Sequence, residues 1–454
     1  MNRFLAICFT ILLLLLTPVV SGSDTVKKIG NLNQINCQIK SDEFKEKEWT
    51  LMFYCGGDTK GINDIGNKTI EVIQNLFMKL PIISDLKINV VVQMDGTRAL
   101  IGCYKATSRF INKFELIEEY DEVNLGDYTL LRDFIIRCKT EFPANRYFLY
   151  CFGHGCGWRG IFPDYKTNET GNNYDILTME EIHNALNESG GVDIIAFSNC
   201  IMGCVECAYE LRNCTDVFIG SEEIVSNFFT PINTWYNILN VLQKNSESST
   251  YEISKKIINR YKKFYWYYWS PGHLILPILN AIGNQNITHI FRPPLFTMSA
   301  IRTDKMNELC SAIDEFSELL LKNLSIYKTF IHDIRLETED FPHKLLTTDP
   351  LSMGFRIDVY HFADLMADPL LKIFEPDLFN AAQKIKRCVN MSVIKEWHQI
   401  GHPNAHGVGL FFPPKDFTNY PDIYKNYNLD NYMNSTLEFK DNCQWDEFLE
   451  CYLN

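Results

Sequence analysis

Short apolar runs and amphipathic stretches alternate along the first half of the chain. Runs rich in β-branched and aromatic residues predict strands at 48–55, 87–95, 146–152, 192–199 and 216–221. Stretches with apolar residues at helical spacing predict helices between them, at 68–80, 127–142, 178–186 and 201–212. Thr178 and Glu181 form the signature of a capping box at the start of one helix. This alternation predicts βαβ units and a mostly parallel sheet with helices on both faces.

The pattern changes near residue 240, where helical spacing becomes dominant. The second half predicts helices at 250–266, 305–324, 354–366 and 377–389, and a late strand at 406–414. A chain of 454 residues is long for a single core. We therefore expect a polar tail over 23–47, a sheet domain over 48–240 and a more helical domain over 241–454.

The first residues have a different character. Residues 1–22 contain Arg3, a long apolar run and then small residues, which is the pattern of a secretory signal peptide cleaved near Gly22. An uncleaved anchor helix is the alternative. No later run is apolar and long enough to span a bilayer. We expect a mature protein in the extracellular space or the endolysosomal lumen, without stable membrane insertion.

Charge, cysteine content and glycosylation sequons narrow the class further. The net charge of −13 and the absence of a basic patch in the sequence argue against a nucleic-acid partner. Fifteen cysteines in a secreted chain predict that most pair in disulfides. N-glycosylation sequons begin at Asn67, Asn168, Asn187, Asn213, Asn286, Asn323, Asn390 and Asn434.

Candidate chemistry lies beyond two of the predicted strands. His154 and Gly155 follow the strand at 146–152, and Cys200 follows the strand at 192–199. Parallel strands end at one edge of a sheet, where ligands bind. A helix starting directly after Cys200 would lower the pKa of its thiol. These groups predict a cysteine hydrolase that acts on amide bonds. The thiolate would be the nucleophile, the histidine would protonate the departing amine, and the Gly155 N–H would face the oxyanion.

A plainer interpretation applies to each residue taken alone. A histidine among glycines is usually structural, and a cysteine in a cysteine-rich chain is usually half of a disulfide. Cys204 and Cys207 follow Cys200 on the predicted helix. A metal cluster with His154 is conceivable there, but packing or a disulfide is the stronger expectation, and we assign no metal.

The motifs FGHGCGW (152–158) and DIIAFSNCIMGCVECAYEL (193–211) resemble those of the clostripain family of cysteine peptidases, which has the caspase-like superfold. The resemblance extends over about 48–415. It implies an α/β fold, with a caspase-like, mostly parallel sheet flanked by helices and a more helical C-terminal domain. It also implies an endopeptidase that forms a thioester acyl-enzyme on Cys200, with His154 as catalytic histidine and Gly155 supporting the oxyanion.

The resemblance has one departure, and it concerns specificity. Ser198 stands where the family usually has an aspartate that favours Arg or Lys before the scissile bond, and a hydroxyl cannot hold a guanidinium as a carboxylate does. Glu222 or Glu223 could supply the missing charge, and a small or polar pocket is the main rival. The altered pair Ser198-Asn199 also motivates one alternative, a secreted, inactive pseudoenzyme that binds peptides. A disulfide-rich structural glycoprotein is a further alternative, and it requires Cys200 to be paired.

Three further expectations follow from the resemblance and from the residues around the candidate site. Related peptidases are often cut between the two catalytic residues, so the polar loop at 159–175 is a candidate for processing, at Arg159 or Lys166. Trp158 and Trp235 are more readily explained by packing than by lining a substrate cleft. No organic cofactor is implied, and the loop at 58–64 lacks the spacing of a known calcium site, so calcium is not assigned.

Overall fold

The computed structural model describes residues 47–56, 87–95, 102–107, 113–119, 123–164, 175–225, 230–263, 296–341, 355–414 and 429–454. These residues belong to one compact unit, which extends from Glu46 to Asn454. The signal sequence, the tail before residue 46, the helix expected at 68–80 and the loop at 58–64 lie outside the described residues. Within the described ranges, no helix is both long and apolar enough to cross a membrane.

A nine-stranded sheet, in the order β13-β10-β9-β8-β5-β1-β2-β3-β4, is the centre of this unit. The strands are β1 (Lys47–Gly56), β2 (Ile88–Asp95), β3 (Gly102–Thr107), β4 (Lys113–Glu119), β5 (Ala144–Phe152), β8 (Val192–Ser198), β9 (Thr215–Gly220), β10 (Thr297–Arg302) and β13 (Val393–His398). The strands from β9 through β8, β5 and β1 to β2 are parallel. Antiparallel strands extend both edges. The predicted α/β fold with a mostly parallel sheet is confirmed.

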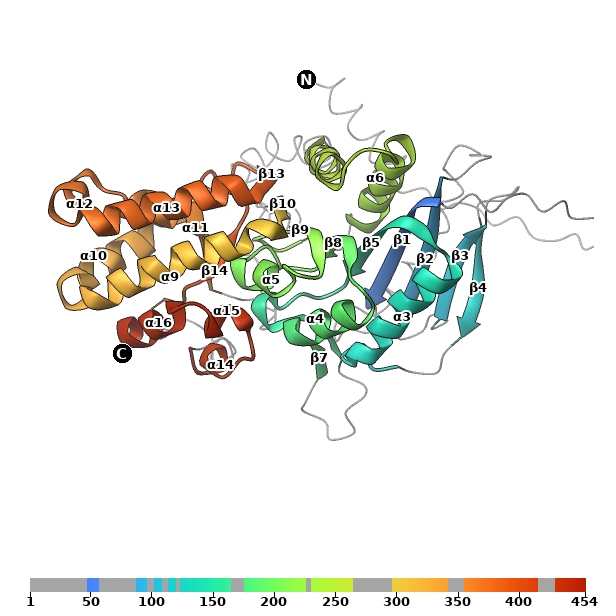
Figure 1. Cartoon of the computed structure of the whole chain (residues 1–454), viewed down its shortest axis with the longest axis horizontal. Helices are drawn as coiled ribbons and strands as arrows, with labels where there is room; N and C mark the ends of the chain where they lie inside the picture. The colour runs from blue at the N-terminus through green and yellow to red at the C-terminus, as the bar shows by residue number, and fades with distance from the viewer. Residues whose placement is uncertain are drawn as a thin grey trace, which may run out of the picture. The chain divides into compact units, whose positions relative to one another are not determined.

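Alternating residues of the central strands enter two different cores. In β1, Met52 and Tyr54 face a core with α3 (Tyr128–Glu141), α4 (Met179–Glu188) and α5 (Val205–Glu210). Leu51 and Phe53 face the other core, with α6 (Thr230–Lys244) and the helical residues 250–263. Figure 1 shows α6 on one side of the strands and α3 and α4 on the other. Successive side chains of a strand point to opposite faces, and both faces are buried here. The sequences of these strands are therefore continuous apolar runs.

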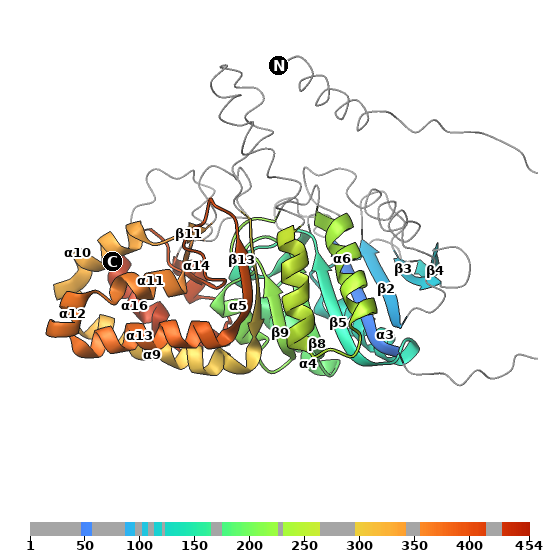
Figure 2. The same cartoon turned by 90° about the horizontal axis from the view of Figure 1, so that it is seen from above.

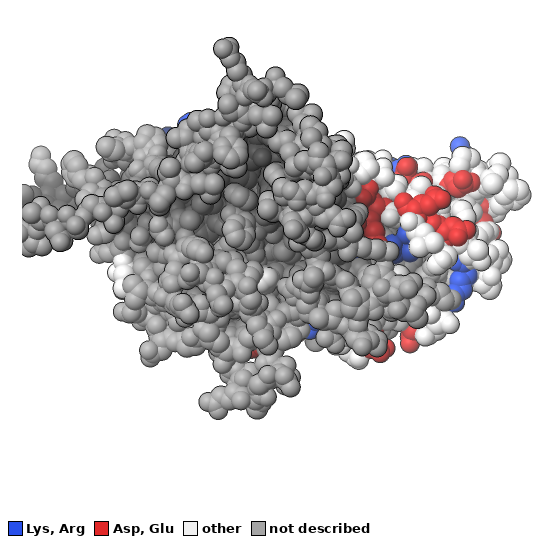
Figure 3. Space-filling view, turned by 180° about the vertical axis from the view of Figure 1, so that it is seen from behind, with Lys and Arg blue, Asp and Glu red and all other residues white. Residues whose placement is uncertain are grey.

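The C-terminal half contributes helices and short strands. Its helices are α9 (Met306–Lys322), α10 (Leu324–Glu337), α11 (Val359–Met366), α12 (Pro369–Phe374), α13 (Pro376–Ser392), α14 (Leu429–Met433), α15 (Glu438–Asp441) and α16 (Trp445–Leu453). They gather beyond the β13 edge of the sheet (Figure 2). Acidic side chains gather on the surface at this end of the unit, when it is seen from behind (Figure 3). The predicted helical character is confirmed, and the division into two domains at residue 240 stays a prediction.

Two smaller sheets complete the architecture. One pairs β6 (Ile161–Asp164) with β7 (Asp175–Leu177), on either side of the polar loop. The other has the order β11-β12-β14, with β11 (Asp340–Phe341), β12 (Arg356–Asp358) and β14 (Gly409–Phe411). The helix predicted over 354–366 therefore begins only at Val359, because the residues before it pair with β11 and β14.

The helix predicted over 201–212 is also shorter than expected. Ile201 has a φ of 58°, which is left-handed backbone that a helix cannot contain. The N–H groups of Ile201 and Gly203 bond to the carbonyls of Glu223 and Ser221 instead. The chain turns after Cys200, and α5 starts only at Val205.

The capping box predicted from Thr178 is present. The Thr178 side chain accepts from the Glu181 N–H at 3.2 Å, and the Glu181 carboxylate accepts from the Thr178 N–H at 2.8 Å. Two N–H groups at the start of α4 are thereby satisfied. This contact fixes the connection from the β7 hairpin to the helix.

Thr178→Ala should lower the free energy of unfolding by about 1 kcal/mol, because it leaves the cap of α4 unsatisfied. Thr140→Ala is the matched control, since the Thr140 hydroxyl only bonds back to the Ile136 carbonyl on the exposed side of α3. Urea unfolding of both variants measures the difference. Equal losses would contradict the role assigned to the cap.

Candidate active site

His154 and Cys200 lie beyond the carboxyl ends of two neighbouring parallel strands. β5 and β8 are adjacent in the sheet, and Phe152 lies opposite Ser198 in their register. His154 and Cys200 each follow two residues later. The sheet therefore brings the two residues to the same edge from separate loops, as the sequence predicts.

The two loops are in contact through their backbones. A Cβ atom on Gly155 would lie 2.7 Å from the Cys200 nitrogen and 2.8 Å from the Asn199 carbonyl carbon, so only glycine fits there. The Asn199 side-chain amide donates to the His154 carbonyl at 2.9 Å, and the Phe162 N–H donates to the same carbonyl at 3.1 Å. These contacts set the position of the His154 backbone relative to the Cys200 loop.

The Cys200 thiol faces the backbone of the segment that follows β9. Cys200 is 5% exposed. Its Sγ accepts from the Val225 N–H at 3.4 Å and donates to the Val225 carbonyl at 3.7 Å. The expectation of a helix N-terminus beside this thiol is wrong, because α5 begins only at Val205. The structure instead provides the Val225 N–H as a donor to the sulfur, and a hydrogen-bond donor favours the thiolate.

Ser198 and Asn199 are both buried, at 3% and 0% exposed. Ser198 is the last residue of β8, directly before the Cys200 loop. The Asn199 side chain is committed to the His154 carbonyl through its amide nitrogen. Its Oδ1 has no hydrogen-bond partner among the residues that the structure describes. The structure thus places Ser198 next to the candidate nucleophile, while its role in substrate binding stays a prediction.

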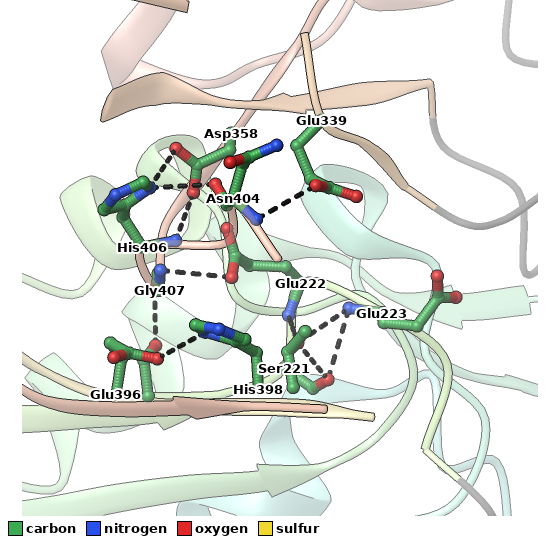
Figure 4. A network of polar contacts seen from close by, with 12 residues as sticks. Ser221, Glu222, Glu223, Glu339, Asp358, Glu396, His398, Asn404, His406 and Gly407 are labelled. Carbon is green, nitrogen blue, oxygen red and sulfur yellow. Dashed lines mark hydrogen bonds and ion pairs between the residues drawn. The ribbon is translucent and has the colours of Figure 1, made fainter. Parts of the chain in front are cut away.

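Glu222 and Glu223 follow β9 but point in different directions (Figure 4). Glu222 is 1% exposed, and its carboxylate accepts from the Gly407 N–H at 3.1 Å. Burial raises the pKa of Glu222 well above its usual range, and the neighbouring Asp358 raises it further. Burial thus favours the protonated form of Glu222, which is held by the Gly407 backbone.

Glu223 belongs to a second buried group that sequence reasoning did not identify. Its carboxylate lies 2.9 Å from Nε2 of His402, and Nδ1 of the same ring lies 2.9 Å from Glu339. Burial favours the neutral ring, but the hydrogen bonds to Glu223 and Glu339 outweigh it and raise the pKa of His402 to about 9. His402 is therefore a buried cation between two carboxylates. No sequence signal links these three residues.

Two of the other candidate residues, Trp158 and Arg159, lie within the described part of the chain. Trp158 is 3% exposed and packs edge-on against Phe411 and Tyr432, which agrees with a packing role. Arg159 ends the short helix Gly157–Arg159, whereas Lys166 and the Trp235 side chain lie outside the described residues. Among the residues that the structure describes, no group of three or more His, Cys, Asp or Glu side chains could hold a metal ion.

Many cysteines are thiols rather than disulfides. The free thiols include Cys55, Cys151, Cys204, Cys207, Cys214, Cys310, Cys388, Cys443 and Cys451. Cys204 and Cys207 are neighbours, with their sulfurs 3.2 Å apart. The predicted disulfides are therefore not shown among the described residues: all of these side chains except Cys451 are buried in the core, where a cysteine acts as a small apolar residue.

The sequons fall into two groups. Asn187, Asn213, Asn390 and Asn434 are exposed and Asn323 is half-buried, whereas Asn67, Asn168 and Asn286 lie outside the described residues. Exposure is the condition that glycosylation of a folded chain requires. Modification at these positions stays a prediction.

Asn199→Asp should destabilise the protein by about 2 kcal/mol or more, because a carboxylate cannot donate to the His154 carbonyl and would be a buried charge. The control is Asn380→Asp, the same change at an exposed position of α13 that begins no sequon, which should stay within about 0.5 kcal/mol. Urea unfolding compares the two. A small effect at Asn199 would mean that its amide does not hold the two loops together.

Comparisons with known proteins agree with this architecture. The Clostripain family profile matches residues 73–452. Clostripain of Hathewaya histolytica is 27% identical over 226 residues, which are 43% of this chain and 42% of that protein. The chain thus aligns with less than half the length of this relative.

Two solved structures share the fold. A secreted C11 cysteine protease from Bacteroides thetaiotaomicron, in complex with an irreversible peptide inhibitor, has a TM-score of 0.58 at 17% identity, covering 88% of this chain and 99% of that one. An inactive zymogen C11 protease from Parabacteroides distasonis has a TM-score of 0.57, with the same identity and coverage. With the profile match over most of its length, this chain belongs to the clostripain family.

Proposed function

We propose that this protein is a cysteine endopeptidase in which Cys200 is the nucleophile and His154 the general acid and base. The observation that carries the proposal is the contact between the Gly155 and Cys200 backbones, at the ends of two adjacent parallel strands. It joins a thiol, a histidine and two backbone N–H groups at one sheet edge. Family membership supports the same assignment.

The chemistry follows from these groups. The Cys200 thiolate attacks the carbonyl carbon of the scissile peptide, and the N–H groups of Gly155 and Cys200 stabilise the oxyanion. His154 protonates the leaving amine as the C–N bond breaks, which gives a thioester on Cys200. A water molecule, deprotonated by His154, then hydrolyses the thioester and releases the acid product. No cofactor takes part in these steps.

The site favours a substrate residue other than Arg or Lys before the scissile bond. Ser198 offers a hydroxyl where the family usually has a carboxylate, and the buried Glu222 side chain, whose pKa is raised by burial, accepts from the Gly407 N–H. The Glu223 carboxylate is engaged by His402. A guanidinium needs a free carboxylate for strong binding. We infer a preference for small or polar side chains.

The compartment is part of the proposal. Residues 1–22 have the pattern of a signal peptide, and the Bacteroides structure is described as a secreted protease. We propose that the protein acts outside the cell or in an endolysosomal lumen, with glycans on its exposed sequons. Its partner there is a polypeptide substrate.

Cleavage-site profiling on a diverse peptide mixture tests both parts of the proposal. The wild-type protein should produce new termini that Cys200→Ala does not, with Arg and Lys in the minority before the cut. The assay is repeated after limited proteolysis and with calcium. An absence of Cys200-dependent cuts in every condition would contradict the enzyme and favour a peptide-binding pseudoenzyme.

Ser198→Asp should raise kcat/KM for an arginine substrate by about tenfold or more, because it restores a carboxylate beside the nucleophile. Ser198→Asn is the control of similar size without the charge, and it should show no such gain. Cuts by the wild-type protein mainly after Arg or Lys would contradict the specificity inferred from Ser198.

A further inference from the structure

We propose that His402 and Glu223 are positioning residues of the active site, which hold the segment 221–225 against the Cys200 thiol. This inference rests on the proposed function only for its effect on catalysis. The contacts themselves are between described residues. For the segment 221–225 we use the name thiol-facing segment.

The thiol-facing segment runs beside the Cys200 loop and bonds to it repeatedly. The Ser221 carbonyl accepts from the Gly203 N–H at 2.8 Å, and the Glu223 carbonyl accepts from the Ile201 N–H at 3.2 Å. At its end, the Val225 N–H donates to the Cys200 sulfur. The position of Glu223 therefore affects the position of the Val225 N–H, which donates to the thiol.

Glu223 is fixed at both carboxylate oxygens. One accepts from the Ile224 N–H at 2.7 Å, and the other pairs with His402. The Glu223 and His402 side chains are 0% and 1% exposed, so water does not screen this pair. Breaking such a buried pair costs more than breaking one at the surface.

The geometry gives the charge of His402. Both ring nitrogens face carboxyl oxygens at 2.9 Å, and an ionised carboxylate only accepts, so this arrangement favours a ring with protons on both nitrogens. The ring is then an imidazolium that links the thiol-facing segment to Glu339, at the start of the β11-β12-β14 sheet. A neutral ring has a single N–H and could serve only one of the two carboxylates.

An aromatic ring and the groups around Glu339 are among the neighbours of the His402 ring. Phe341 packs against it, with the ring centres 4.7 Å apart. The other oxygen of Glu339 accepts from the Asn404 N–H, and the Glu339 N–H donates to Nδ1 of His361. His361 thus acts as an acceptor, and burial lowers its pKa. On the far side of the segment, Glu222 bonds to Gly407.

Two variants separate positioning from simple electrostatics. His402→Gln removes the cation, and it should lower kcat by about tenfold with little change in KM, because the thiol loses its placed donor. Glu339→Gln removes a negative charge, which by itself would lower the pKa of the Cys200 thiol. If the Glu223–His402–Glu339 linkage positions the thiol-facing segment, the pKa of the Cys200 thiol should rise in both variants.

The measurement is the pH profile of Cys200 alkylation by iodoacetamide, read on the Cys200 peptide by mass spectrometry because the exposed Cys451 thiol reacts with the same reagent. We expect the midpoint to move up by about one pH unit in His402→Gln and by less in Glu339→Gln. His398→Gln is the control, since His398 pairs with Glu396 on β13 at 3.0 Å and is partly exposed. It should keep the wild-type profile.

The pH dependence of thermal stability tests the charge of His402 independently of alkylation. The folded-state pKa of His402 is raised from 6.5 to about 9, so its stabilisation is complete below about pH 6.5 and is lost as pH rises through about 9. The thermal midpoint of the wild-type protein should fall towards that of His402→Gln over this range.

The outcomes are distinguishable from failure of the proposed function, because alkylation does not require peptidase activity. A lower thermal midpoint with an unchanged alkylation profile and unchanged kcat per titrated site would show a purely structural role and overturn the proposal. A downward shift in Glu339→Gln would overturn it as well. If His402→Gln does not fold, Glu339→Gln, altered at the partly exposed end, decides the question.

Discussion

The parallel pairing of β5 with β8 is the constraint on which the candidate site depends. It aligns Phe152 with Ser198, so the two loops leave the sheet side by side. The chain then uses glycine at 155, because any side chain there would collide with the backbone at Cys200. A sheet register and one missing Cβ atom therefore bring a histidine and a thiol from separate parts of the sequence to one edge.

The C-terminal half contributes to this edge as well as to the core. The Gly409 N–H donates to the Gly203 carbonyl at 2.9 Å, so β14 holds the turn after Cys200. Arg356 of β12 is fully buried, and its guanidinium occupies the space that a Gly157 side chain would need. The Glu206 carboxylate of α5 accepts from the Phe411 N–H at 2.8 Å. The loops of the site thus rest on residues from both halves of the chain.

The sequence predicted those features that depend on local patterns. The strands around 48–55, 87–95, 146–152, 192–199 and 216–221 were recognisable because each is buried on both faces, and the capping box at Thr178 joins residues three positions apart. His154, Gly155 and Cys200 became candidates because they follow two strand ends, and the resemblance to the clostripain family strengthened that assignment. The helix expected directly after Cys200 was wrong because bonds to 221–223 replace the first helical turn.

Long-range pairings were beyond reach of such patterns. The addition of β10 and β13 to the sheet depends on antiparallel partners far apart in the sequence. The pairing of His402 with Glu223 joins residues 179 positions apart, and neither residue has a local motif. Their burial together with Glu339 is visible only in the folded chain. The pKa of His402 follows from that burial and pairing, not from the sequence around it.

The most direct test of the central claim is covalent capture of the nucleophile by a peptidyl acyloxymethyl ketone. The folded protein is incubated with the reagent and digested, and the modified peptide is identified by mass spectrometry. The account predicts one adduct, on Cys200, that is lost on denaturation and strongly reduced in His154→Ala. An adduct on Cys451 or spread over several cysteines, independent of folding and of His154, would contradict it.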